Sequence, residues 1–163
     1  FDLQQRGELP LRVTHNDTKL NNVLLDERTM KGLCVIDLDT VMPGLSAHDF
    51  GDTVRFGAND CREDEEDQSK VHFLPQLYRV CERGFLSQAG EVLTAREKEV
   101  LRWGAKLMTL ECGMRFLTDY LQGDVYFKIA RPDQNLDRAR TQFTLVQQME
   151  ACWDELAPEE SKL

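Results

Sequence analysis

The segment from Val13 to Asp39 constrains the fold most, because it sets two short apolar runs on either side of a polar turn. The apolar runs are Val23–Leu25 and Leu33–Ile36, and acidic, basic, threonine and glycine residues lie between them. Short β-branched and apolar runs that are punctuated in this way are typical of a β-hairpin. A hairpin folds its two open ends together, so residues just outside the two runs are expected to lie close to one another.

Polar side chains occupy both of these open ends. They are His15, Asp17 and Asn22 before the first run, and Asp37 and Asp39 after the second. Carboxylates that approach one another raise each other's proton affinity unless a cation neutralises them. Oxygen ligands of this kind suit Mg²⁺, which proteins usually hold through one or two carboxylates together with phosphate oxygens. The segment therefore predicts a site for phosphate chemistry.

The spacing His15-x-Asp17-x-x-x-x-Asn22 matches the kinase catalytic-loop pattern, in which His-x-Asp is followed by four residues and an Asn. In that pattern the Asp accepts or orients the proton of the substrate hydroxyl, and the Asn supplies a metal ligand. A second metal-binding Asp is then expected one hairpin later, at the end of a hydrophobic strand. Asp37 follows Leu33–Ile36 and holds that position. We expect Asp17 to be the catalytic base.

A literal D-F-G triplet, Asp49-Phe50-Gly51, occurs further along the chain. The preceding residues, Met42–His48, are typical of a loop and not of a hydrophobic strand, so we do not assign Asp49 to the metal. We interpret Asp49 as an early residue of the next helix, where its carboxylate caps free N–H groups or braces the catalytic loop. A plain helix cap is the alternative.

Composition narrows the class of protein. The net charge of −9 disfavours nucleic acid as a partner, because such binding depends on neutralising phosphates with Lys and Arg. No apolar run approaches the ~20 residues of a membrane span. The five cysteines are scattered and form no C-x-x-C pair, which indicates neither a zinc site nor a disulfide framework. We expect a cytoplasmic protein.

Downstream of the hairpin the pattern is almost entirely helical. Apolar residues recur at helical spacing over Val71–Ala89, and Thr94-x-x-Glu97 is a capping box that opens one long helix ending near Gly123. A last amphipathic helix is expected over Leu136–Leu156. The acidic run Cys61–Asp67 is typical of a solvated loop. The predicted fold class is α+β and mostly helical, a small β-hairpin followed by several long helices.

This layout is that of the carboxy-terminal lobe of a kinase. The chain contains no Gly-rich phosphate loop and no strand lysine of the V-A-I-K type. We therefore interpret residues 1–163 as the catalytic and substrate-binding lobe, with the nucleotide-binding amino-terminal lobe absent, and we expect the isolated lobe to be inactive.

Longer motifs carry a resemblance to a known family. The segments are H-N-D-T-K-x-N-N-V-L, V-I-D-L-D-T-V-M-P-G, D-F-G-D-x-x-R-F-G-A-N and L-M-T-L-E-C-G-M-R-F-L-T-D-Y-L-x-G-D-V-Y-F. The chain resembles the aminoglycoside phosphotransferase and choline kinase superfamily, and within it the N-acetylhexosamine 1-kinases, from Val13 to Trp153. The resemblance implies transfer of a phosphoryl group from ATP, with Mg²⁺, to the anomeric hydroxyl of N-acetylglucosamine or N-acetylgalactosamine.

The resemblance also implies residue roles. Asp17 would lie near the sugar C1 hydroxyl, Asn22 and Asp37 would hold Mg²⁺, and Asp39 would be a further metal or outer ligand. Arg115 and Tyr126 would contact the sugar. The structural alternatives are that Arg115 pairs with Asp119 and that Tyr126 is a core residue. His15 would support the catalytic loop through its ring nitrogens.

Other functions remain open at this point. The acceptor of a related kinase is an aminoglycoside, choline or homoserine. Val35–Val41 also fits the D-x-D-x-[T/V] pattern of haloacid-dehalogenase-like phosphatases, whose fold needs alternating strands and helices that the rest of the chain lacks. A kinase-like lobe that only binds is a third possibility. The sequence does not fix the oligomeric state.

Overall fold

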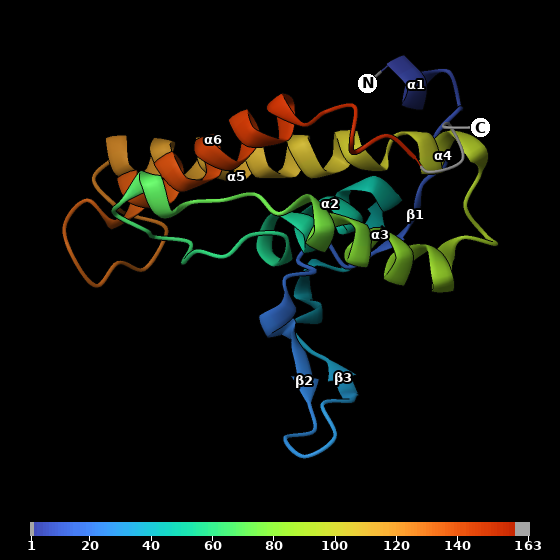
Figure 1. Ribbon diagram of the computed structural model, residues 1–163, viewed down its shortest axis with the longest axis horizontal. Helices are drawn as coiled ribbons and strands as arrows, with labels where there is room; N and C mark the ends of the chain where they lie inside the picture. The colour runs from blue at the N-terminus through green and yellow to red at the C-terminus, as the bar shows by residue number, and fades with distance from the viewer. Residues whose placement is uncertain (1, 159–163) are drawn as a thin grey trace.

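The computed structural model describes residues 2–158 and shows a layer of helices from which one β-hairpin projects (Figure 1). The strands are short, and the longest helices belong to the second half of the chain. In order, the elements are α1 (Asp2–Gln5), β1 (Arg12–Thr14), β2 (Val23–Leu25), β3 (Gly32–Val35), β4 (Met42–Gly44), α2 (Ser46–Gly57), α3 (Pro75–Ala89), α4 (Ala95–Glu99), α5 (Leu101–Leu121) and α6 (Gln134–Ala151), with 3₁₀ turns at Leu20–Asn22, Leu38–Thr40 and Gln68–Lys70.

The two β pairs are antiparallel, and β2 with β3 forms the hairpin that the sequence predicts. The second pair, β1 with β4, joins Thr14 to Met42 and Val13 to Pro43. The loop predicted over Met42–His48 is wrong at its first three residues, which form strand β4. Pro43 and Gly44 are uncommon in strands, so the sequence did not indicate one there. Within residues 2–158 no parallel sheet occurs, so the phosphatase fold is not supported and the mostly helical α+β class is confirmed.

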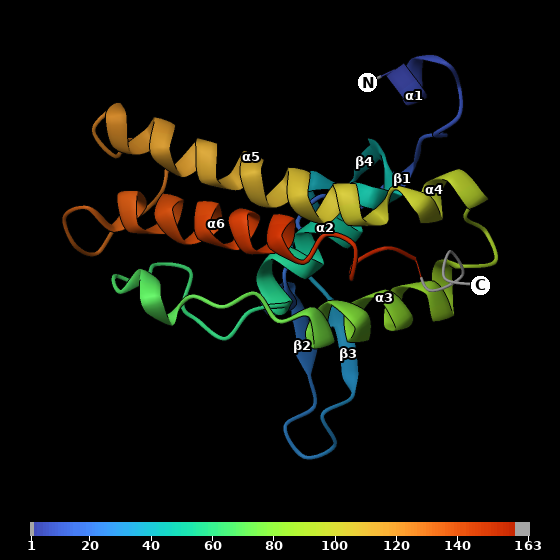
Figure 2. The ribbon, with the colours of Figure 1, turned by 45° about the horizontal axis from the view of Figure 1, so that its top comes forward.

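Helices α5 and α6 lie side by side and run in opposite directions, and α2 crosses α5 (Figure 2). The crossing is close because both helices carry glycine there: a Cβ on Gly104 would lie 1.9 Å from the carbonyl oxygen of Ala47, and one on Gly51 would lie 2.3 Å from that of Gly104. The core around it buries the largest apolar side chains of α2, α3, α5 and α6, among them Phe50, Tyr78, Leu101, Leu145 and Met149. Each such side chain contributes roughly 1.5–3 kcal/mol on burial.

The predicted helix from Thr94 to Leu121 is divided into α4 and α5. The capping box is present, with the backbone N–H of Glu97 donating to Thr94 Oγ1 at 3.2 Å and that of Thr94 donating to Glu97 Oε2 at 2.8 Å. Val100, with φ −90° and ψ 0°, is the C-cap of α4, and α5 starts directly after it. The apolar periodicity continues across this break, which is why the sequence did not reveal it.

The sequence predicted the end of helix α5 correctly but not the bounds of helix α6. Gly123 adopts φ +91°, the left-handed conformation expected just beyond a helix end, so this terminator is confirmed. Helix α6 runs from Gln134 to Ala151 and not from Leu136 to Leu156. Among the helices within residues 2–158, none is both long enough and apolar enough to cross a membrane.

Candidate active site

The catalytic loop, residues 15–19, is fixed to the first turn of α2 by Asp49. The carboxylate of Asp49 accepts the backbone N–H groups of His15 and Asn16, each at 2.8 Å. Asn16 has φ +61°, and this left-handed conformation turns two consecutive N–H groups toward one carboxylate. Thr18 adds a third tie by donating its hydroxyl to the Asp49 carbonyl oxygen. Asp49 is therefore engaged with the backbone of the loop.

Asp17 is held at one oxygen by two donors. Asn22 Nδ2 donates to Asp17 Oδ2 at 2.7 Å, and Lys19 Nζ lies 2.8 Å from the same oxygen. Burial acts to raise the pKa of Asp17, but the hydrogen bonds from Lys19 and Asn22 and the charges of Lys19 and Arg55 outweigh it and hold that pKa below its usual value. Asp17 is thus an ionised carboxylate at neutral pH.

The end of the hairpin is tied to the same loop. Ile36 N–H donates to the Asn22 carbonyl oxygen at 2.9 Å, and His15 Nε2 lies 3.0 Å from the Ile36 carbonyl oxygen. Asp37 follows directly and has φ +61°, so the chain turns sharply there into the 3₁₀ turn Leu38–Thr40 that contains Asp39. The backbone pairing therefore ends with Ile36 opposite Asn22, and Asp37 is the next residue beyond this pair.

The expected meeting of three carboxylates is not found. Within residues 2–158 no group of three or more His, Cys, Asp or Glu side chains is placed to hold a metal ion. The left-handed turn at Asp37 leaves the carboxylates of Asp37 and Asp39 exposed, whereas Asp17 is directed to Asn22 and Lys19. The prediction that Asp17, Asp37 and Asp39 form one preformed cluster is therefore wrong.

A smaller donor set still fits Mg²⁺. The Asn22 side chain is buried, and its amide N–H groups donate to the carbonyl oxygen and to Oδ2 of Asp17. Its amide oxygen is therefore available as a metal ligand. Asp37, one residue beyond the Ile36 that pairs with Asn22, offers an exposed carboxylate. One amide oxygen and one carboxylate are enough for Mg²⁺ when substrate phosphates and water complete its octahedron.

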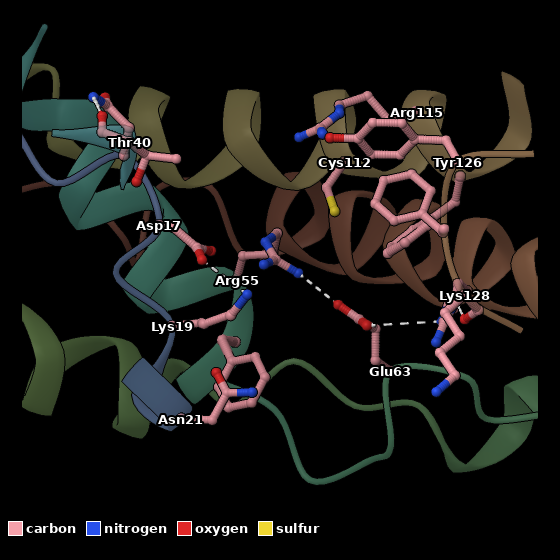
Figure 3. Close-up of a pocket in the computed structure, with 15 residues that line it drawn as sticks. Asp17, Lys19, Asn21, Thr40, Arg55, Glu63, Cys112, Arg115, Tyr126 and Lys128 are labelled. Carbon is pink, nitrogen blue, oxygen red and sulfur yellow. Dashed lines mark hydrogen bonds and ion pairs between the residues drawn. The ribbon is translucent and has the colours of Figure 1, made fainter. Parts of the chain in front are cut away.

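A cavity of about 420 Å³ opens beside Asp17 (Figure 3). Its near side is the catalytic loop with Asp17 and Lys19, and its far side is made by α5, by residues 122–133 and by α6. Arg115 and Tyr126, the two predicted sugar contacts, both line it. Arg115 makes no ion pair with Asp119 among the described residues, and Tyr126 is 74% exposed, so neither of the two structural alternatives holds.

Asp119 binds the backbone of residues 125–127 and not Arg115, and the sequence did not indicate this role. Its carboxylate accepts the backbone N–H groups of Val125, Tyr126 and Phe127 at 3.0, 2.8 and 2.9 Å, and also the amide of Asn135 at 2.9 Å. Burial acts to raise the pKa of Asp119, but these hydrogen bonds keep it below its usual value. Asp119 therefore folds residues 125–127 against the end of α5 and so positions Tyr126.

Two further cavity residues were missed. Arg55 on α2 is buried and binds Asp52 Oδ1 and Glu63 Oε1, each at 2.9 Å. Glu63 belongs to the acidic run that was interpreted as solvated, and it lines the cavity instead. The spacing of Asp52 and Arg55, three residues apart on one helix face, was a signal for part of this network. The long-range partner Glu63 left no such signal.

Cys112 also lines the cavity, opposite Arg55. Burial raises the pKa of Cys112 to about 11, with Glu63 and Asp52 acting in the same direction and Arg55 and Arg115 against it. The thiol is therefore protonated at neutral pH, and a protonated thiol is not a nucleophile. The carboxylates that line this cavity are those of Asp17 and Glu63, and the Glu63 carboxylate is bound to Arg55.

One comparison with known families bears on this site. The sequence model described as the phosphotransferase enzyme family, APH, matches residues 1–82, half of the 163-residue chain. The matched part contains the catalytic loop, the β2–β3 hairpin, Asp37 and the whole of α2, whereas the far side of the cavity lies beyond it. The chain therefore belongs to the phosphotransferase enzyme family.

Proposed function

We propose that the chain is the catalytic and acceptor-binding lobe of an ATP- and Mg²⁺-dependent kinase that phosphorylates the anomeric hydroxyl of an N-acetylhexosamine. The observation that carries the proposal is that Asp17, Arg115 and Tyr126 line one cavity although they lie far apart in the sequence. Family membership supports a small-molecule phosphotransferase. The acceptor and the anomeric position rest on the motifs around Arg115 and Tyr126.

The chemistry needs few groups, because phosphoryl transfer depends mostly on positioning and charge neutralisation. The acceptor oxygen attacks the γ-phosphorus, the bond from that phosphorus to the ADP oxygen breaks, and the hydroxyl proton passes to Asp17. A carboxylate of lowered pKa suffices, because the hydroxyl becomes acidic only as the new P–O bond forms. Lys19, bound to Asp17, would approach the transferred phosphoryl group.

Asn22 and Asp37 would hold Mg²⁺ at the end of the hairpin. When bound, the ion would neutralise the charge of the nucleotide phosphates. Asp49 would keep the loop in place through His15 and Asn16, and His15 would tie the loop to the hairpin through the Ile36 carbonyl. Asp39 is retained only as an outer ligand, since none of these contacts involves it.

The far side of the cavity suits a sugar. Tyr126 and Phe127 form an edge-to-face pair with centroids 4.8 Å apart, and Phe116 lies 4.7 Å from Phe127. The Arg115 guanidinium lies 5.9 Å from the Tyr126 ring centroid and offers several N–H donors beside it. Sites of this composition combine apolar contact area with a few polar groups that orient the ligand.

The exposed surface of the hairpin supports a second lobe. Large apolar side chains gather there and are about half exposed or more: Leu24, Leu25, Met30, Leu33 and Val35. Contiguous exposed apolar surface marks an interaction site. A nucleotide-binding lobe that covers this surface would place ATP against Asn22 and Asp37.

A cytoplasmic location is part of the proposal. All five cysteines are free thiols, which is compatible with a reducing compartment. The partners would be ATP and a small-molecule acceptor.

The test is an acceptor screen with the full-length protein, ATP and Mg²⁺. N-acetylglucosamine, N-acetylgalactosamine, kanamycin, choline and homoserine are supplied in turn, and ³¹P NMR identifies the product. We expect a sugar 1-phosphate, and its loss in Asp17→Asn but not in the control Asp60→Asn, whose carboxylate is exposed and contacts His72. Phosphorylation of only the cationic acceptors would contradict the proposal.

A further inference from the structure

The far side of the cavity is cationic although the chain carries a net charge of −9. We call Arg115, Lys128 and Arg138 the cationic wall; they belong to α5, to the segment that follows it and to α6. The other two cations of the cavity are already neutralised, Lys19 by Asp17 and Arg55 by Asp52 and Glu63. The wall therefore sets the charge that an acceptor meets.

The side chains of Arg115 and Lys128 have no carboxylate within ion-pair distance in the described part of the chain. Arg115 is held in place by aromatic rings, with its guanidinium 5.4 Å from the Phe127 centroid. The aromatic rings thus orient the Arg115 guanidinium, and no carboxylate neutralises its positive charge.

Arg138 is only partly satisfied. Its Nη1 donates to Asn135 Oδ1 at 2.8 Å and to the Lys128 carbonyl oxygen at 3.3 Å, while its Nε is buried without a hydrogen-bond partner. The carboxylate of Glu63 forms a long ion pair with this Nε, at 3.9 Å, and is shared with Arg55. A buried donor without a partner is costly, and an anionic oxygen would satisfy it.

The cationic wall also lies too far from the end of the hairpin to bind the phosphates of the nucleotide. Figure 3 shows Asp17 at one end of the cavity and Tyr126 and Lys128 at the other. The end of the hairpin, with Asn22 and Asp37, adjoins Asp17, and nucleotide phosphates held there would lie on that side. An anion bound by the wall would belong to the acceptor.

We propose that the acceptor is a sugar that carries an anionic group, a phosphate or a carboxylate, remote from the hydroxyl that is phosphorylated. The inference rests on the proposed function and narrows its acceptor class. Arginine binds such planar or tetrahedral oxyanions through paired N–H donors, and Lys128 adds a point charge. A cationic acceptor would be repelled by the wall, and a neutral one would leave it unpaired.

The test compares three acceptors that share a free anomeric hydroxyl, using the full-length protein with ATP and Mg²⁺. They are N-acetylglucosamine, its 6-phosphate, and N-acetylmuramic acid, whose carboxylate is on the O3 substituent. We expect kcat/KM to be at least about tenfold higher for one anionic sugar than for the neutral one, which corresponds to one charge-assisted hydrogen bond. The two anionic sugars distinguish phosphate from carboxylate.

Two further readouts separate a specific anion site from general attraction. The advantage of the anionic sugar should decrease when the salt concentration is raised from about 20 to about 300 mM, because partly exposed charges are screened. Lys128→Gln should lower the ratio of anionic to neutral kcat/KM by about fivefold. Lys70→Gln removes the same charge from a lysine that contacts only Asp67, and it should leave the ratio unchanged.

The outcomes for the two proposals are distinct. Transfer to the neutral sugar with equal or better kcat/KM would overturn the anionic acceptor and leave the sugar kinase standing. Transfer to none of the three sugars would contradict the proposed function, and calorimetric binding would then decide the inference. Tighter binding of an anionic sugar that Lys128→Gln weakens supports the anion site, and equal binding of all three sugars overturns it.

Discussion

At the scale of single residues, Asp17 shows how a carboxylate is kept both ionised and oriented. Lys19 and Asn22 share its Oδ2, and Oδ1 has no hydrogen bond within residues 2–158. An oriented base with one oxygen available is what a hydroxyl acceptor requires. The lowered pKa keeps Asp17 charged at and below neutral pH.

Lys19 is therefore predicted to control the acid limb of the pH–rate profile. Activity needs ionised Asp17, so it is lost as the pH falls through the pKa of Asp17. Lys19→Met removes a hydrogen bond and a positive charge, so this pKa rises and the acid limb moves to higher pH. We expect kcat/KM at pH 7 to fall by about tenfold, because a hydrogen bond that orients Asp17 is lost, and a profile from about pH 3 to 8 follows the acid limb. Lys70→Met is the control, and an unchanged limb would refute the pairing with Lys19.

The two exposed aspartates at the end of the hairpin should behave differently. Asp37 adjoins Asn22 through the Ile36 hydrogen bond, whereas Asp39 lies in the turn beyond it. We expect Asp37→Asn to raise the KM for Mg·ATP by at least about tenfold, because a carboxylate ligand is lost. Asp39→Asn should change it by less than about threefold. Initial rates against Mg²⁺ concentration decide, and equal effects would show that Asp39 is also a direct ligand.

At the scale of elements, the segment after α5 depends on one side chain. Asp119 accepts three consecutive backbone N–H groups, those of residues 125–127, and Asn135 of α6 joins it. Gly123, in the left-handed region, allows the chain to turn back toward Asp119. Tyr126 is thus placed by a carboxylate that never meets the acceptor.

Asp119→Ala is predicted to lower the acceptor affinity without altering the transfer residues. Its loss frees several N–H groups and should destabilise the fold by about 2–4 kcal/mol. We expect the KM for the acceptor to rise by at least about tenfold, while the KM for ATP stays within about twofold. Steady-state kinetics with circular dichroism melts provide the check, and Asp154→Ala is the exposed control. A parallel rise in both KM values would indicate general unfolding instead.

Glu97 joins three elements and is predicted to make stability dependent on pH. It binds Arg12 of β1 through two hydrogen bonds, at 2.7 and 3.0 Å, accepts from Ser46 of α2, and caps α4. The hydrogen bonds from Arg12 outweigh burial and lower the pKa of Glu97 from 4.5 to about 2. The ionised carboxylate thus contributes about 3 kcal/mol above pH 4.5, and this contribution is lost as the pH falls toward 2.

Urea unfolding of Glu97→Gln tests this. We expect the variant to be about 3 kcal/mol less stable than the parent protein at pH 7, and the difference to shrink by about 2 kcal/mol at pH 3. Glu99→Gln removes an exposed carboxylate that pairs with Arg96 and should cost less than about 1 kcal/mol. A difference that does not change with pH would show that Glu97 acts through packing alone.

At the scale of the whole molecule, the apolar hairpin projects away from the helical layer (Figure 1). Leu33 and Val35 are 65% and 52% exposed on β3. If the nucleotide lobe covers them, Leu33→Lys should raise the KM for ATP by at least about fivefold in the full-length protein. The same change should make the isolated 163-residue chain less prone to associate, as measured by light scattering. Glu27→Lys in the turn is the control for charge, and an unchanged KM for ATP would place the lobe elsewhere.

How much the sequence predicted depends on the range of the interaction. The hairpin, the capping box of Thr94 and Glu97, and the terminator Gly123 are local patterns, and all three are confirmed. The pairing of Thr14 with Met42 and the binding of Glu63 to Arg55 join residues with no shared periodicity. Tertiary packing alone decides such contacts, so the position of Glu63 at the cavity was missed, although the acidic run is otherwise partly exposed to solvent.

The close crossing of α2 and α5 has a mechanical consequence. No Cβ fits between Gly104 and Ala47, so any larger residue at position 104 would force the two helices apart. Close to this crossing, α2 carries Asp49, the anchor of the catalytic loop. Helix α5 continues from Gly104 to Arg115, a length of about 16 Å at 1.5 Å per residue. Because α2 carries Arg55 and α5 carries Cys112 and Arg115, the spacing of these two helices in the core also sets the distance between two sides of the cavity.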